Sequence, residues 1–312
     1  MSHRSQAKRF SYYFFNTLGL CIPNFIFRLL LQKKISKLNT SDQAYIQNRV
    51  NYYNKLSVVD NRGRFDNSVA AFKKTKGTTY FFDMRNVIKY FSRHLKFSMI
   101  PGDVTRIPEV PTFVKSRPIT HDNENAVLLK LNKIRHFNFI KDEISYTDKK
   151  DQVAWRGVGY QPHRLVVIKQ FYEHKMCNIG QTKPYQGNPW EKGYMSIEEQ
   201  LQYKFLLCIE GNDVATNLKW VMSSNSLCLM SKPKFETWFM EGSLEAGVHY
   251  VELKDDYSDL IEKMEYYLAD EQEALTIIKN ANKYVDQFKD EKREQLISLL
   301  VAQKYFKQSR QL

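Results

Sequence analysis

Cysteine is scarce in this chain. Of 312 residues only four are cysteine, and they lie far apart, at Cys21, Cys177, Cys208 and Cys228. A zinc site needs cysteine and histidine ligands at short, regular spacings, and a disulfide framework needs more cysteines. The sequence therefore argues against both kinds of protein and favours a reducing compartment.

Glycine and proline are also too few for a repetitive chain. Twelve glycines and nine prolines exclude a collagen-like or low-complexity sequence. The aromatic content of 14% excludes disorder, because disordered chains are poor in aromatic residues. At roughly 150 residues per domain, the length predicts two domains with buried cores.

Several motifs of nucleotide and hydrolytic chemistry are absent. The sequence has no G-x-G-x-x-G that opens a helix, no G-x-x-x-x-G-K-[ST], no G-x-S-x-G and no H-E-x-x-H. It also lacks D-x-D, an acidic pair that often holds a metal–nucleotide complex. A nucleotide diphosphate would therefore be neutralised by arginine, lysine and backbone N–H groups.

Acidic residues are outnumbered. Lysine and arginine total 47 against 34 aspartate and glutamate residues, which gives a formal net charge of +13. Such a surplus attracts nucleic acid, anionic lipid head groups or phosphorylated small molecules. Because no RNA-recognition, zinc-finger or basic-zipper signature is present, we do not expect nucleic acid as a partner.

Residues 1–38 form a basic, aromatic and amphipathic N-terminal segment. Residues 10–31 are apolar, and the basic residues on either side are Arg4, Lys8, Arg9, Lys33, Lys34 and Lys37. A membrane span needs about 20 apolar residues. This run is interrupted by Asn16, Pro23, Asn24 and Arg28. No small-residue cleavage site follows it, which argues against a signal peptide.

The same segment fits an interfacial role. Its aromatic residues suit the head-group boundary of a bilayer, and its lysines suit anionic lipid. This pattern favours peripheral contact with a membrane surface. The alternative, that the apolar face packs on the protein's own core, remains open.

The rest of the chain divides into two predicted lobes, 39–150 and 151–290, and a C-terminal helix, 291–312. In the second lobe short apolar runs alternate with helical patterns, which is typical of an α/β domain with a parallel sheet. Its strands are predicted at 153–157, 205–209, 226–230 and 248–253. Residues 178–193 are rich in glycine, proline and asparagine and are predicted to form a loop.

In the first lobe, a short apolar strand is predicted at 97–100. The β-branched and aromatic composition of 78–82 predicts another strand. A helix is predicted at 126–131 and a strand at 137–140.

Three side chains stand at positions suited to chemistry. Arg156 precedes Gly157 at a predicted strand end, and Arg164 opens the next helix. Two guanidinium groups at a helix start form an anion site, although two surface salt bridges fit the spacing as well. Asp103 lies in a Pro/Gly turn after an apolar strand, where a carboxylate acts as a general base or simply forms the turn.

Several blocks of sequence occur in a specific order. They are Ile100-Pro-Gly-Asp-Val-Thr, Ala154-Trp-Arg-Gly, Leu206-Leu-Cys-Ile-Glu-Gly-Asn-Asp, Ser223-Ser-Asn-Ser-Leu, Phe235-Glu-Thr-Trp-Phe and Gly247-Val-His-Tyr-Val. Together they resemble glycosyltransferase family 90, which includes CAP10-type proteins, eukaryotic protein O-glucosyltransferases and bacterial lipopolysaccharide-core enzymes. The resemblance covers about residues 85–290 and is strongest to the bacterial branch.

The resemblance implies a GT-B-like α/β fold, in which two Rossmann-like lobes enclose a nucleotide-sugar cleft. The first lobe would take the acceptor, and residues 151–290 would hold the donor. It implies an inverting, metal-independent transfer in which Asp103 is catalytic and takes the proton of the acceptor hydroxyl. The positions that we expect at the donor are Arg156, Gly157, Arg164, Asn217, Lys219, Ser226 and Glu236.

At three of these positions the sequence departs from the family or allows a second role. At Asn217 many members of the family have arginine, a departure that bears on how the diphosphate is held. Ser226 either donates to a phosphate or ribose or shapes a tight turn. Glu236 stands beside Trp238, whose ring either contacts the donor or packs in a core.

The expected function is transfer of a hexose from a UDP-sugar to a sugar hydroxyl of the lipopolysaccharide inner core. No cofactor and no metal are expected, and the acceptor-binding residues are not identified. We expect a cytoplasmic protein held at the inner face of the inner membrane. The alternatives are a protein O-glycosyltransferase or a capsule glycosyltransferase of the same family, and a non-catalytic glycan-binding protein on the same scaffold.

Overall fold

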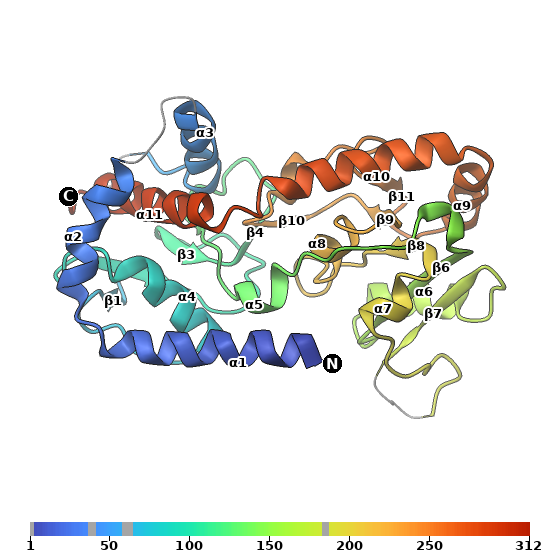
Figure 1. The fold of residues 1–312 in the computed structure, drawn as a ribbon, viewed down its shortest axis with the longest axis horizontal. Coiled ribbons are helices and arrows are strands. Elements are labelled where there is room, and N and C mark those ends of the chain that lie inside the picture. Colours follow the sequence, from blue (N-terminus) through green and yellow to red (C-terminus); the bar gives the residue numbers. More distant parts are fainter. Residues whose placement is uncertain (1–2, 37–41, 58–64, 183–186) are drawn as a thin grey trace. The chain divides into compact units, whose positions relative to one another are not determined.

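A computed structural model of the chain describes residues 3–36, 42–57, 65–182 and 187–312 (Figure 1). Its contacts divide the chain into two compact units. The parallel-sheet unit comprises His136–Lys234 and Met240–Lys289. The terminal unit comprises the residues up to Arg135, the short segment Phe235–Phe239 and the C-terminal Asp290–Leu312. The division thus falls at Arg135, ahead of the boundary expected near 150, and the C-terminal helix belongs to the same unit as the N-terminal residues.

Five parallel strands form the sheet of the parallel-sheet unit, in the order β11-β9-β8-β6-β7 (Figure 1). The strands are β6 (Lys150–Gly157), β7 (Cys177–Gln181), β8 (Tyr203–Leu207), β9 (Leu227–Ser231) and β11 (Val251–Leu253). Read from the β7 edge and numbered along this unit, the order is 2-1-3-4-5. In such a doubly wound sheet the strand order reverses between the first and third strands, here β6 and β8.

The sequence forms this sheet because its strands are apolar on both faces. Phe205, Leu206 and Leu207 of β8 have no exposed surface, as parallel strands covered by helices require. The crossover from β6 to β7 runs through α6, whose first helical residue is Pro162, a position where proline's missing N–H costs nothing. The helices of this unit are η3 (Tyr146–Asp148), α6 (Pro162–Phe171), α7 (Ile197–Gln200), α8 (Leu218–Val221), η4 (Glu241–Ser243), α9 (Leu260–Ala269) and α10 (Glu271–Asp286).

The terminal unit contains a smaller sheet of order β1-β2-β3-β5. Strands β2, β3 and β5 are parallel, and β1 is antiparallel to β2. A separate two-stranded ribbon pairs β4 with β10. The strands are β1 (Asn67–Ser68), β2 (Lys96–Met99), β3 (Thr112–Val114), β4 (Ser116–Pro118), β5 (Ala126–Leu128) and β10 (Phe235–Thr237). The two connections between the parallel strands, both within the described chain, contain no helix, so this sheet is simpler than a Rossmann sheet.

Helices from both ends of the chain cover the terminal unit. They are α1 (His3–Leu18), η1 (Gly19–Cys21), α2 (Asn24–Ile35), α3 (Gln43–Tyr53), α4 (Thr78–Ile88) and α11 (Glu291–Gln308), and α5 (Lys133–His136) spans the division. Helix α11 packs against α3 and α4. Its Tyr305 ring lies 4.1 Å from that of Phe113 in β3, which brings the C-terminus onto the small sheet.

The strand predictions at 97–100, 153–157, 205–209, 226–230 and 248–253 are confirmed within a few residues. Four other local predictions are wrong. Residues 78–82 begin helix α4, in which the buried Met84 and Ile88 lie one turn apart and Phe82 and Asp83 are buried on other sides of the helix. Residues 126–128 form strand β5, whose pairing with β3 overrides their helix propensity.

The other two errors concern loops. Residues 137–140, all described, form no strand. The predicted loop at 178–193 contains most of strand β7 in its described part, and residues 183–186 lie outside the described residues. Polar side chains are tolerated in β7 because it is an edge strand of the sheet.

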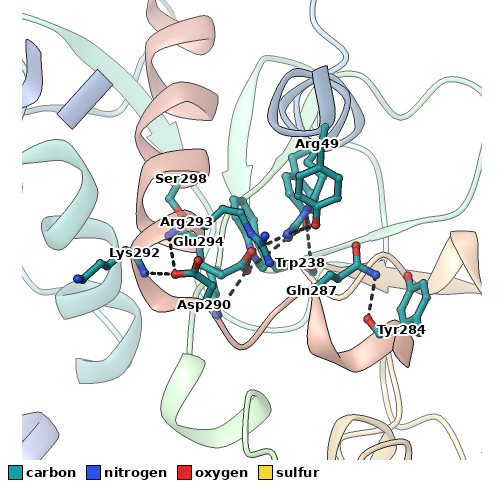
Figure 2. Close-up of polar contacts among 12 residues, drawn as sticks. Arg49, Trp238, Tyr284, Gln287, Asp290, Lys292, Arg293, Glu294 and Ser298 are labelled. Carbon is teal, nitrogen blue, oxygen red and sulfur yellow. Dashed lines mark hydrogen bonds and ion pairs between the residues drawn. The ribbon is translucent and has the colours of Figure 1, made fainter. Parts of the chain in front are cut away.

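A buried carboxylate organises the core of the terminal unit (Figure 2). Glu294 of α11 accepts a hydrogen bond from Arg49 Nη1 at 2.6 Å and another from Trp238 Nε1 at 2.5 Å. The Trp238 ring stacks on Tyr53, with 3.8 Å between the ring centroids. Tyr53 Oη in turn donates to the carbonyl oxygen of Trp238 at 2.8 Å. This cluster joins α3, the 235–239 segment and α11, which are far apart in sequence.

Replacing Glu294 with alanine is expected to lower the free energy of unfolding by about 3 kcal/mol, because Arg49 would lose its buried carboxylate. Urea unfolding measures this loss. The control is Lys292→Ala, an exposed change on the same helix that should cost less than about 0.5 kcal/mol. Equal losses in the two variants would contradict the role assigned to Glu294.

A second buried carboxylate holds α1 to α4. Asp83 Oδ1 accepts a hydrogen bond from Tyr12 Oη at 2.8 Å, and Oδ2 accepts one from the backbone N–H of Lys133 at 2.9 Å. Burial raises the pKa of Asp83 to about 6, although the Lys133 charge opposes this shift. The N-terminal helix is therefore attached through a group that titrates near neutral pH.

The stability of the protein should fall as the pH rises from about 4 to about 6, because folded Asp83 holds its proton more tightly than an unfolded aspartate of pKa about 3.9. In Asp83→Asn this contribution is absent. The variant should therefore gain about 2–3 kcal/mol relative to the wild type between pH 4 and pH 7. Urea unfolding at the two pH values tests this, and a constant difference between the proteins would refute it.

Candidate active site

The carboxyl ends of β6 and β8 form the edge at which the strand order reverses. In open α/β sheets, ligands bind beyond the carboxyl ends of the strands at this point. Strand β6 ends at Arg156 and Gly157, and β8 is followed by the turn Ile209-Glu210-Gly211. Because β6 and β8 are paired, these two turns are neighbours. We call this region the reversal edge.

Arg164 joins the two turns of the reversal edge. From the first turn of α6 its guanidinium donates to the carbonyl oxygens of Val158 at 3.2 Å, Ile209 at 2.9 Å and Glu210 at 2.8 Å. The group also lies over the Trp155 ring, 5.5 Å from its centroid. The guanidinium of Arg164 therefore does not form a surface salt bridge, as one alternative from the sequence supposed. It bonds to the backbone that follows β6 and to the backbone that follows β8, and it fixes their relative position.

Arg156 is the residue before the last one of β6, and its guanidinium reaches the neighbouring strand β7. Its Nη1 donates to the carbonyl oxygen of Asn178 and its Nη2 to Asn178 Oδ1, both at 2.6 Å. The Nε–H is buried and has no hydrogen-bond partner among the described residues. Burial also lowers the pKa of Arg156. The next residue, Gly157, is glycine for a steric reason. A Cβ at this position would lie 2.4 Å from the Trp155 ring, so any larger residue would require the ring to move.

Asn217 and Lys219 begin the short helix α8. Asn217 Nδ2 donates to the carbonyl oxygen of Leu207, the last residue of β8, at 2.8 Å. This places Asn217 at the carboxyl end of the sheet, next to the reversal edge. Lys219 is fully buried, and its ammonium pairs with the equally buried Glu241. The Lys219 ammonium therefore lies inside the parallel-sheet unit, where its ion pair with Glu241 joins α8 to η4.

Two predicted donor residues lie elsewhere. Ser226 Oγ donates to the carbonyl oxygen of Tyr203, the first residue of β8, at 2.8 Å. It therefore belongs to the amino edge of the sheet, opposite the reversal edge, and supports the turn interpretation. Glu236 lies in β10 of the terminal unit, where Arg117 Nε donates to it at 2.7 Å and the Tyr52 hydroxyl also donates. Trp238, with no exposed surface, packs in the core of the same unit.

Asp103 lies beyond the carboxyl end of β2 in the terminal unit. Gly102 before it has a φ of 103°, a conformation that favours glycine and makes the turn. The Asp103 side chain is 34% exposed, and its Oδ1 accepts a hydrogen bond from Lys115 Nζ at 2.6 Å. Lys115 follows the neighbouring parallel strand β3 and is itself buried. The turn thus presents an accessible carboxylate that a buried ammonium orients.

A cavity of about 250 Å³ opens beside this turn in the terminal unit. Its lining includes Phe72, Lys73, Lys76, Phe81, Met99 and Pro101. The last two lead directly into Asp103. The rings of Phe72 and Phe81 are stacked, with centroids 5.4 Å apart. The cavity therefore combines aromatic surface with two lysines and one aspartate, Asp66, and its lining residue Pro101 is two positions from Asp103.

Sequence reasoning missed Lys115 and Asn178. Lys115 directly follows the apolar run Thr-Phe-Val at a strand end, and that position was a usable signal. Asn178 fell in the predicted loop, so its pairing with Arg156 had no local signal.

The chain is a mixed α/β protein whose larger parallel sheet ends, at the reversal edge, in turns that Arg164 holds together. The family model described as Glycosyl transferase family 90 matches residues 129–305. The chain therefore belongs to glycosyltransferase family 90, and it is a glycosyltransferase. The family resemblance of the sequence blocks is thereby confirmed.

Three proteins illustrate how much of the chain its relatives match. O-glucosyltransferase LpsA of Dichelobacter nodosus is 46% identical over 265 residues, which cover 85% of this chain and 83% of that protein. Protein O-glucosyltransferase 3 of Homo sapiens is 27% identical over 142 residues, covering 43% of this chain and 28% of the human protein. Uncharacterized protein 179R of Invertebrate iridescent virus 6 is 32% identical over 97 residues, which are 29% of this chain and 8% of that protein.

The buried Lys219–Glu241 pair predicts a structural phenotype. Lys219→Met should lower the free energy of unfolding by about 3 kcal/mol, because Glu241 would lose its cation inside the unit. Adding Glu241→Gln to that variant should restore part of the loss, because the uncompensated charge is removed. Urea unfolding of the single and double variants measures both effects, with the exposed Lys232→Met as control. A single variant as stable as this control would show that the pair does not support the unit.

Proposed function

We propose that this glycosyltransferase transfers a hexose from a UDP-hexose to a sugar hydroxyl of the lipopolysaccharide inner core, with inversion and without a metal. In this proposal the parallel-sheet unit holds the donor and the terminal unit supplies the base, as in a two-lobed GT-B enzyme. Glucose is the first hexose to test, because the relative at 46% identity is named an O-glucosyltransferase. The observation that carries the proposal is the reversal edge, whose two turns Arg164 holds together beside the N-terminus of α6.

The reversal edge supports binding of a diphosphate. The N-terminus of α6 offers backbone N–H groups and the positive end of the helix dipole. Arg156 adds a buried Nε–H that a phosphate oxygen would satisfy, and a buried donor left without an acceptor is uncommon in proteins. Arg164 keeps the two turns in place and adds positive charge. Guanidinium groups neutralise the charge that develops on the leaving diphosphate, which is the metal-free way to stabilise it.

Asp103 supports the proton transfer. Its carboxylate would accept the proton of the acceptor hydroxyl while that oxygen forms a bond to the anomeric carbon. The bond between the anomeric carbon and the diphosphate oxygen breaks in the same step, and UDP leaves with the electron pair. Attack from the face opposite the leaving group inverts the anomeric configuration. Lys115 positions the carboxylate and stabilises its ionised form through their 2.6 Å contact.

The cavity beside Asp103 supports an anionic sugar acceptor. The flat faces of Phe72 and Phe81 suit the apolar faces of sugar rings, and Lys73 and Lys76 suit phosphate substituents. An acceptor sugar held there would have a hydroxyl near the turn that carries Asp103. Inner-core sugars with phosphate groups have this chemistry, and a cytoplasmic site of action at the inner membrane follows from such an acceptor.

The test is transfer by the purified protein, with UDP-glucose and UDP-galactose offered in parallel to a truncated core oligosaccharide. We expect product with one donor, an unchanged rate in EDTA and inverted anomeric configuration by NMR. Loss of activity in EDTA would overturn the metal-free mechanism. Transfer to a protein acceptor instead would favour the protein O-glycosyltransferase alternative, for which the human relative argues.

Asp103→Asn should lower kcat by about 10²- to 10⁴-fold, because the acceptor hydroxyl would lose its base. The Kd for UDP should stay within about twofold of the wild-type value, since donor binding is assigned to the other unit. Glu109→Gln, an exposed carboxyl change six residues away, is the matched control and should keep wild-type turnover. If Asp103→Asn turns over normally, Asp103 is not the base. A folded wild-type protein that binds core oligosaccharide but transfers from no donor would support the glycan-binding alternative.

A further inference from the structure

The first two helices expose an unusual amount of apolar surface. Among the described residues, ten of the nineteen exposed large hydrophobic side chains lie between Phe10 and Leu30. Phe10 is 72% exposed, Phe15 66% and Leu29 74%. The rings of Phe10 and Phe14 stack along one side of α1, with centroids 5.9 Å apart. We call the exposed apolar side chains of α1, η1 and α2 the N-terminal apolar surface. Such a concentration of exposed apolar groups on a folded protein marks an interaction site.

The opposite sides of the same helices are anchored to the terminal unit. Tyr12 of α1 donates to the buried Asp83 at 2.8 Å, and Asn86 Nδ2 donates to Asn16 Oδ1 at 2.5 Å. Anchored in this way, α1 presents a defined side outward.

Helix α2 is held in a similar way. The Phe27 ring packs against Tyr90 at 5.4 Å, and Lys89 Nζ lies 4.0 Å above the Phe27 ring. Lys34 Nζ donates to Gln295 Oε1 of α11 at 2.8 Å. One side of the segment therefore packs on the terminal unit, and the other side is exposed.

The segment that carries this surface has charges of one sign. No aspartate or glutamate occurs between residues 1 and 41, whereas Lys8, Arg9 and Lys33 are exposed on the two helices. Lys37 lies outside the described residues. A segment that exposes both apolar and basic side chains complements an anionic bilayer, in which the apolar groups enter the interface and the cations meet the head groups.

The path of the segment fits an orientation along the membrane plane. In the described part of the chain, no single helix is long and apolar enough to cross a membrane, and Ala7–Cys21 and Asn24–Ile35 reach that length and composition only as a pair bent by 108°. Figure 1 shows α1 and α2 as separate helices that meet at this bend.

We propose that the N-terminal apolar surface binds the head-group region of an anionic lipid bilayer. The contacts of Tyr12, Asn16 and Phe27 fix this surface to the terminal unit. Binding to the membrane would therefore set the orientation of the whole terminal unit relative to the bilayer. The proposal does not depend on which sugar is transferred, and it stands or falls separately from the catalytic role of Asp103.

The test is co-sedimentation of the full chain with vesicles. One set contains phosphatidylglycerol and phosphatidylcholine, and the other contains phosphatidylcholine alone. We expect binding to the first set that is at least about tenfold stronger than to the second and that weakens as salt is raised. The variant Phe14→Ser/Leu29→Ser should bind at least about tenfold more weakly, because two exposed apolar side chains would no longer enter the interface.

The matched control is Leu275→Ser/Leu312→Ser, which changes two exposed leucines outside this surface and should bind as the wild type does. A second variant, Lys8→Glu/Lys33→Glu, keeps the apolar side chains and should lose the preference for anionic vesicles. Circular dichroism and turnover of a soluble acceptor should be unchanged in all variants, which separates this test from that of the proposed function.

Two outcomes would overturn the proposal. One is a failure of the vesicle experiment: the wild-type protein sediments with neither set of vesicles, or Phe14→Ser/Leu29→Ser binds as strongly as the wild type does. The other is a dimer, seen by analytical ultracentrifugation without lipid, that the same variant dissociates. That result would assign the surface to a second copy of the chain.

Discussion

The buried carboxylate of Glu294 is the contact on which the organisation of this chain depends. It accepts hydrogen bonds from Arg49 of α3 and from the Trp238 indole of the 235–239 segment, and it is itself part of the C-terminal helix. A carboxylate with 2% of its surface exposed is stable only when such donors surround it. Three segments separated by more than 50 residues are therefore obliged to meet in one core.

This meeting determines how the chain is divided. The 235–239 segment leaves the parallel-sheet unit and pairs, as β10, with β4 of the terminal unit, and the last helix returns to that unit as well. Glu236 is consequently bonded to Arg117. A signature that the family resemblance associates with the donor thus contributes, in this chain, to the core of the unit that also carries Asp103.

The parts of the site that local pattern predicted are those formed within one strand and its turn. Arg156, Gly157 and Asp103 lie at strand ends because apolar runs followed by glycine or proline mark such ends. Residues 78–82 were misassigned because β-type composition is also compatible with a helix once its buried side lies against other helices. The positions of Ser226 at the amino edge and of Lys219 in a buried ion pair had no local signal, because burial and the choice of sheet edge depend on strand order.

The sequence by itself determined the family, the buried strands of the parallel sheet and the basic, apolar character of the N-terminus. Each is encoded in one or more short runs of contiguous residues. Tertiary structure decided the rest. The strand order brings Arg164 onto carbonyl oxygens more than 40 residues away, β3 brings Lys115 to Asp103, and the anchors at Asp83 and Tyr90 select which side of α1 and α2 is exposed. These contacts join residues distant in sequence, and their geometry is set by strand pairing and burial, which no local pattern specifies.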